Sequence, residues 1–121
     1  MSGDPRHVLG RAGEDQALAH LERKGFHLLE RNYRTRWGEL DLIVADDATL
    51  VFCEVKTRRV GGAPWDSLGP AKQRQVRRMA AAWLASTRER PRVPELRFDA
   101  VGILVGSRGE VVRLDHLEGA F

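Results

Sequence analysis

Two β-rich runs joined by a short acidic turn constrain the fold of this chain more than any other feature. Residues 39–44 and 49–56 are rich in valine, leucine, isoleucine and phenylalanine, and their spacing predicts a β-hairpin. Side chains alternate along a strand, so Glu54 and Lys56 share one face of the second strand. Counting back from the turn places Asp41 nearly opposite Glu54, to within about one residue of register. We therefore expect Asp41 and Glu54 to converge.

The other elements follow from helix and strand signals. Asp4 and Pro5 are typical of a helix start and Gly25 of a helix end. After this first helix we expect a strand over 26–34, the hairpin, a loop over 57–69, a helix from Pro70 that ends before Pro91, and strands over 96–105 and 110–117. A helix between the third and fourth strands favours a right-handed crossover. The sequence predicts an α/β fold (α+β mixed sheet) flanked by helices.

The length of 121 residues fits one domain, residues 1–121, with one core. The chain starts without an apolar signal segment and has no apolar run long enough to span a bilayer. We expect a cytoplasmic protein with no membrane partner. The single cysteine, Cys53, has no cysteine or histidine at ligand spacing, so a structural zinc site is excluded and a buried apolar role is expected.

Basic residues cluster although the formal net charge is only +3. The clusters comprise residues 31, 34 and 36; 56, 58 and 59; 72, 74, 77 and 78; and 88, 90 and 92. Clustering favours a polyanionic partner such as nucleic acid. An arginine-rich, solvated surface would give the same pattern, so charge alone leaves both interpretations open.

Three carboxylates fall at positions that are otherwise apolar. Glu14 lies on the apolar stripe of the first predicted helix, and Asp41 and Glu54 lie inside apolar strands. Burying ionised carboxylates is costly unless a cation or hydrogen bonds compensate. Mg²⁺ or Mn²⁺ would compensate, since both accept hard oxygen ligands, and the backbone carbonyl of Val55 is the natural main-chain ligand. Alternatively, these acids and Lys56 form an ordinary charge pattern on a solvated sheet face.

A metal beside Lys56 would suit phosphodiester hydrolysis. The metal ion activates water and stabilises charge on the phosphate. Lys56 would orient the attacking water and neutralise the phosphate, and a lysine pKa can shift enough for proton transfer. Two neighbours keep open roles. Lys72 either contacts a phosphate or is a solvated helix residue. Glu39 either stabilises the metal-binding residues without binding the metal itself or is a solvated neighbour.

The motifs resemble those of a known superfamily. Residues 38–43 (Gly-Glu-Leu-Asp-Leu-Ile) followed by residues 52–58 (Phe-Cys-Glu-Val-Lys-Thr-Arg) resemble the acidic-residue and Glu-x-Lys signature of restriction-endonuclease-like proteins. With residues 10–14 ahead and 72–84 behind, nearly the whole chain resembles the YraN-like family of small uncharacterised bacterial proteins. That family is itself similar to archaeal Holliday-junction resolvases.

The resemblance implies an αβββαβ core, a divalent metal and a branched or flapped DNA substrate. It assigns Glu14 as the helix carboxylate, Asp41 and Glu54 as metal ligands and Lys56 as the catalytic lysine. The proline that gives the superfamily motif its name is replaced by Leu40. That position is not expected to touch the chemistry.

The leading hypothesis is a Mg²⁺-dependent DNA endonuclease or exonuclease of repair or recombination that selects DNA structure rather than sequence. A homodimer would follow from symmetric cutting of a four-way junction. The alternatives are a non-catalytic nucleic-acid-binding accessory protein and an RNA-cleaving enzyme. The residues expected to contact phosphates are Arg36, Arg58, Lys72 and Arg77.

Overall fold

The computed structural model describes residues 5–62 and 69–121, and side chains from residue 9 onward. The elements are α1 (Pro5–Arg23), β1 (His27–Thr35), β2 (Gly38–Ala45), β3 (Thr49–Arg59), α2 (Pro70–Ser86), β4 (Glu95–Val105) and β5 (Val111–Leu117). Their order matches the prediction. One boundary was wrong: β3 continues through residues 57–59, because these pair with β4. The rest of the predicted loop partly falls on residues 63–68, and the predicted cap Asp4 also lies outside the described residues.

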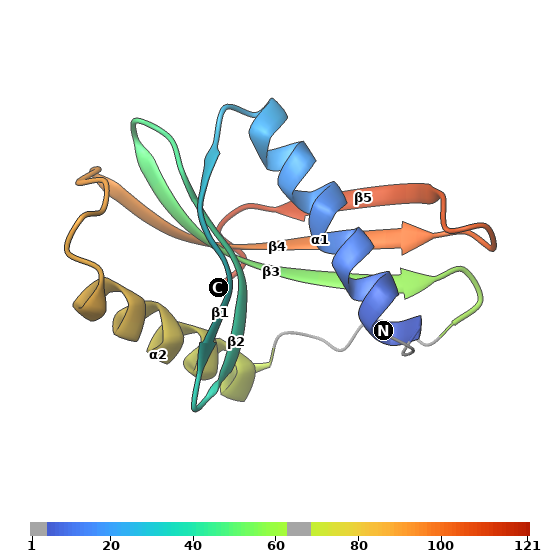
Figure 1. Cartoon of the computed structure of the whole chain (residues 1–121), viewed down its shortest axis with the longest axis horizontal. Coiled ribbons are helices and arrows are strands. Elements are labelled where there is room, and N and C mark those ends of the chain that lie inside the picture. Colours follow the sequence, from blue (N-terminus) through green and yellow to red (C-terminus); the bar gives the residue numbers. More distant parts are fainter. Residues whose placement is uncertain (1–4, 63–68) are drawn as a thin grey trace.

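The five strands form one sheet in the order β1-β2-β3-β4-β5. Neighbouring strands are antiparallel except β3 and β4, which are parallel. A parallel pair cannot be joined by a tight turn, and α2 lies in the connection between β3 and β4. The predicted mixed sheet, with an αβββαβ core followed by β5, is thereby confirmed (Figure 1).

The two helices cover opposite faces of the sheet, because alternate residues of β3 enter different cores. Val51 and Cys53 pack with Leu21 of α1, whereas Leu50 and Phe52 pack with the core residues of α2. Cys53 is fully buried, as predicted. Within the described part of the chain, no helix has the length and apolar character needed to cross a membrane.

The sheet forks between β2 and β3. The registered pairs of these two strands end at Leu42 and Cys53. Beyond them β2 stays paired with β1 as far as Gly38, and β3 stays paired with β4 as far as Arg59. In Figure 1 the β1–β2 ribbon turns away from β3–β5. Asp41 directly precedes Leu42 and Glu54 directly follows Cys53, so both acids lie just beyond the last registered pair, close enough to interact, as the hairpin spacing predicted.

The burial of two leucines predicts how strongly their substitution lowers the free energy of unfolding. Leu42 is fully buried in the core beneath α1, so Leu42→Ala should lower the free energy of unfolding by about 2–5 kcal/mol. Leu117 is 61% exposed, and Leu117→Ala should cost less than about 1 kcal/mol. Urea denaturation followed by circular dichroism measures both. Equal losses would contradict the position of Leu42 in this core.

Candidate active site and metal centre

Three carboxylates meet at the fork of the sheet. Glu14 comes from α1, and Glu39 and Asp41 come from β2, where strand alternation puts them on the same face. Each residue offers one carboxylate oxygen, and these three oxygens lie within 4.8 Å of one another. All three residues are half-buried. Among the described residues this is the one group of three potential ligands at such spacing. Hard oxygen donors in this arrangement suit Mg²⁺ or Mn²⁺.

A close approach of α1 to β3 delivers Glu14 to this group. A side chain on Gly13 would overlap the Thr57 side chain of β3, so glycine allows the helix to lie directly on the strand. Glu14 is the next residue along α1. The Nδ2 atom of Asn32 then donates hydrogen bonds of 2.9 Å to Glu14 Oε1 and 2.9 Å to Glu39 Oε1.

Asp41 caps the edge of β3 where β2 has left it. The backbone N–H of Val55 donates to Asp41 Oδ2 at 2.7 Å. Burial first, and then the nearby charge of Glu54, raises the pKa of Asp41 to about 7, with Glu14 adding to the rise; the Val55 hydrogen bond and the Lys56 charge oppose it. Asp41 is thus an anion that its surroundings stabilise incompletely. That Val55 also offers its carbonyl to a metal stays a prediction.

Glu54 is the most deeply buried of the predicted site residues, at 2% exposed. Its Oε2 lies 3.4 Å from Lys72 Nζ, but its Oε1 is buried without a hydrogen-bond partner among the described residues. Burial raises the pKa of Glu54, against the opposing charges of Lys72 and Lys56. Buried carboxylate oxygens normally have partners. An unpartnered oxygen beside Asp41 is therefore the strongest sign that these residues fit a cation.

Glu54 nevertheless stands outside the three-carboxylate group. The structure brings Glu14 and Asp41 together as predicted, adds Glu39 to them, and places Glu54 next to Asp41 in a contact with Lys72. Lys56 is half-buried, and its charge lowers the pKa of both Asp41 and Glu54. The ammonium group therefore lies within electrostatic reach of both acids.

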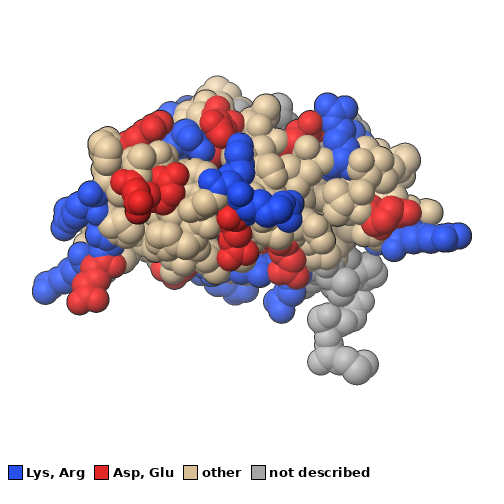
Figure 2. All heavy atoms as spheres, turned by 90° about the horizontal axis from the view of Figure 1, so that it is seen from above, with Lys and Arg blue, Asp and Glu red and all other residues tan. Residues whose placement is uncertain are grey.

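The four predicted phosphate-binding residues are distributed unevenly around this site. Lys72 adjoins it through Glu54, and Arg58 is half-buried two residues beyond Lys56 on β3. Arg36 is exposed in the turn between β1 and β2. Arg77 is exposed on α2 and its guanidinium lies 4.9 Å from the centre of a phenylalanine ring of β4. On the face in Figure 2, basic and acidic side chains are interspersed, so the clusters seen along the sequence do not merge there into one basic surface.

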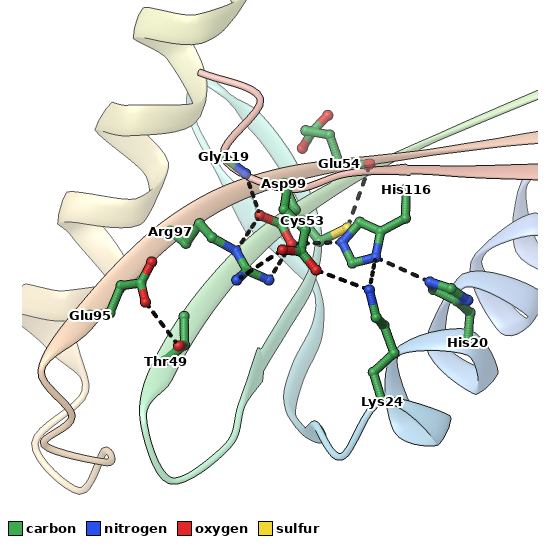
Figure 3. Close-up of polar contacts among 11 residues, drawn as sticks. His20, Lys24, Thr49, Cys53, Glu54, Glu95, Arg97, Asp99, His116 and Gly119 are labelled. Atoms are coloured by element: carbon green, nitrogen blue, oxygen red, sulfur yellow. Dashed lines mark hydrogen bonds and ion pairs between the residues drawn. The ribbon is translucent and has the colours of Figure 1, made fainter.

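A second buried acid, Asp99 of β4, belongs to a different network (Figure 3). Its carboxylate accepts hydrogen bonds from Arg97, from the backbone of Gly119 and from His116 Nε2 at 2.7 Å. His116 Nδ1 in turn lies 3.1 Å from His20 Nε2 of α1. Although burial opposes it, these donors hold the pKa of Asp99 below its ordinary value. This network is fully satisfied and joins α1 to β4, β5 and the C-terminal segment; no ligand spacing in the sequence revealed it.

Comparison with known proteins identifies the family. The model of the family described as "Uncharacterised protein family UPF0102" matches residues 13–103, a range that contains all four predicted catalytic residues. The chain belongs to the UPF0102 family. It is 48% identical to a UPF0102 protein of Frankia casuarinae over 94% of this chain and 96% of the relative. It is 43% identical to one of Geobacter sulfurreducens, over 94% and 88% respectively. The resemblance to YraN-like proteins is thereby confirmed.

The names of these UPF0102 relatives state no activity. Membership therefore supports the fold and the full-length relationship. The chemistry of the site has to be argued from its residues.

The raised pKa of Asp41 predicts how stability depends on pH. Because the folded-state pKa of about 7 exceeds the ordinary value of 3.8, protonated Asp41 favours the folded state. This contribution is fully present below pH 3.8 and is lost as the pH rises through about 7. Without divalent cations at pH 8, Asp41→Asn should stabilise the protein by about 1–3 kcal/mol, since asparagine keeps an acceptor for Val55.

Thermal unfolding from pH 5 to 8 measures this effect. Asp47→Asn removes an exposed acid from the turn after β2 and is the matched control, with little expected change. If Asp41→Asn destabilised the cation-free protein at pH 8, the inferred repulsion within the site would be wrong.

Proposed function

We propose that this UPF0102 protein is a Mg²⁺-dependent nuclease that hydrolyses phosphodiester bonds in nucleic acid, with DNA as its main substrate. The observation that carries the proposal is the buried Oε1 of Glu54, next to Asp41 at the fork, which has no hydrogen-bond partner among the residues that the structure describes. A protein that only bound nucleic acid would gain nothing from a buried anionic cluster, which repels phosphate unless a cation is present. A nuclease needs such a cluster to hold its metal.

The residues of the site divide into cation ligands and one lysine that positions the attacking water. Glu14, Glu39 and Asp41 offer one oxygen each, and Glu54 offers the unpartnered Oε1. A bound Mg²⁺ or Mn²⁺ would supply charge stabilisation at the phosphate and acidify a water molecule. Lys56 holds its ammonium group near Asp41 and Glu54, where it can orient the attacking water and neutralise charge on the scissile phosphate.

Lys72 links the site to substrate binding. Its ammonium group lies 3.4 Å from Glu54 Oε2 and balances the charge of that carboxylate. If Glu54 held a cation, Lys72 would be available to a phosphate oxygen. Arg36, Arg58 and Arg77 would add phosphate contacts, which carry little sequence information. Selection of DNA structure, such as branches or junctions in repair or recombination, follows from the family resemblance and fits this type of contact.

Cleavage of labelled substrates tests the proposal. The panel comprises single-stranded DNA, duplex DNA, a flap, a four-way junction and an RNA duplex, each with Mg²⁺, with Mn²⁺ or with a chelator. Lys56→Ala should reduce the cleavage rate about a hundredfold or more, because it removes the group that positions the water. Lys24→Ala is the matched control, since Lys24 pairs with Glu118 at the protein surface, and its rate should stay within about twofold.

The outcomes separate three functions. Metal-dependent DNA cleavage that is lost in Lys56→Ala and Asp41→Ala supports the proposal and names the substrate. Cleavage of RNA in place of DNA would support the nuclease and correct the substrate. Binding without cleavage under all conditions would replace the proposal with a non-catalytic accessory protein.

A further inference from the structure

Asn32 has an unusual backbone conformation for a residue inside a strand. Its φ is +55°, and among the described residues it is the one non-glycine residue with a positive φ. β1 continues on both sides of it, from His27 to Thr35. Asparagine tolerates the left-handed region better than most residues, but at a cost. Such strain persists where the surroundings impose it, and it clusters at functional sites.

Asn32 lies beside the three grouped carboxylates. The registered pairs on either side leave Asn32 opposite Asp41. Its Nδ2 donates to Glu14 Oε1 and to Glu39 Oε1, each at 2.9 Å. One amide group therefore bridges two of the three grouped carboxylates, and Asn32 lies opposite the residue that carries the third, on the neighbouring strand.

The chemistry of the amide group suits a cation site in both of its states. Ionised carboxylates are acceptors only, so the NH₂ end of the amide must face them when no cation is present. The other end is a carbonyl oxygen, and asparagine carbonyls are ligands for hard cations. Arg34 and Arg31 also contact Glu39 and Glu14, but a guanidinium group has no acceptor to offer a metal.

We propose that Asn32 is a positioning residue of the cation site, which holds Glu14 and Glu39 at the spacing that binds the cation with Asp41. This inference rests on the proposed function and deepens it, since it adds Asn32 to the residues of the proposed cation site. Glu54 adjoins Asp41, and its buried Oε1 has no hydrogen-bond partner among the described residues, which is the independent sign that the acidic group takes a cation. The strained, left-handed backbone of Asn32 is then the cost of placing its amide group between Glu14 of α1 and Glu39 of β2.

Mn²⁺ binding to the full chain tests the inference without an activity assay. Isothermal titration calorimetry gives the dissociation constant, and thermal unfolding without metal checks the fold. Asn32→Gly accepts the positive φ but removes the amide group, and it should weaken Mn²⁺ binding about tenfold or more. Asn32→Asp keeps the size of the side chain but loses the NH₂ donor, so it should lower the unfolding temperature of the protein without metal and, because Glu14 and Glu39 are no longer held, bind Mn²⁺ more weakly than the wild type. Tyr33→Phe alters the next residue, which packs on the α2 side of the sheet, and its dissociation constant should stay within about twofold.

Each result decides between the two proposals. If the wild type and Asn32→Gly bind Mn²⁺ equally well, the positioning role is overturned and the proposed function stays intact. Wild type that binds no Mn²⁺ would overturn the cation site and both proposals. If Asn32→Gly does not fold, Asn32→Asp decides: weaker binding than the wild type together with a lowered unfolding temperature supports the inference, and equal or tighter binding overturns it.

Discussion

The hydrogen bond from the Val55 backbone N–H to the Asp41 carboxylate is the interaction on which the site depends. Where β2 leaves β3, the edge of β3 loses its strand partner, and a buried backbone donor without an acceptor is costly. Asp41 supplies that acceptor at 2.7 Å. The fork is thus sealed by a carboxylate, and the protein carries the electrostatic cost of a partly buried charge at the point where two strands separate.

That cost is shared among several neighbours. Lys72 pairs with Glu54, Lys56 lowers the pKa of Asp41, and Asn32 bridges Glu14 and Glu39. None of these compensates fully, since burial and mutual repulsion still raise the pKa of Asp41. A divalent cation would compensate with two charges at once, and hard oxygen donors are already assembled to receive it. The raised pKa of Asp41 therefore marks a cost in stability, and the proposed cation site would account for it.

Two buried acids in this UPF0102 protein show how a structural carboxylate differs from a candidate functional one. Asp99 is fully buried, yet Arg97, His116 and Gly119 satisfy it and its pKa is lowered. Glu54 is equally inaccessible, yet one of its oxygens has no partner among the described residues and its pKa is raised. Burial alone therefore does not mark a site. The incomplete satisfaction of a buried charge does.

The sequence by itself determined the order of the elements, the hairpin register to within about one residue, and the convergence of Asp41 with Glu54, because strand alternation and turn spacing are local properties. It also placed Glu14 on the inner face of α1, through the helical spacing of apolar residues. Only the tertiary structure decided that Glu39 joins Glu14 and Asp41, and that Asn32 bridges them. Those contacts depend on where the sheet forks and how closely α1 approaches β3, and both follow from packing between segments distant in sequence.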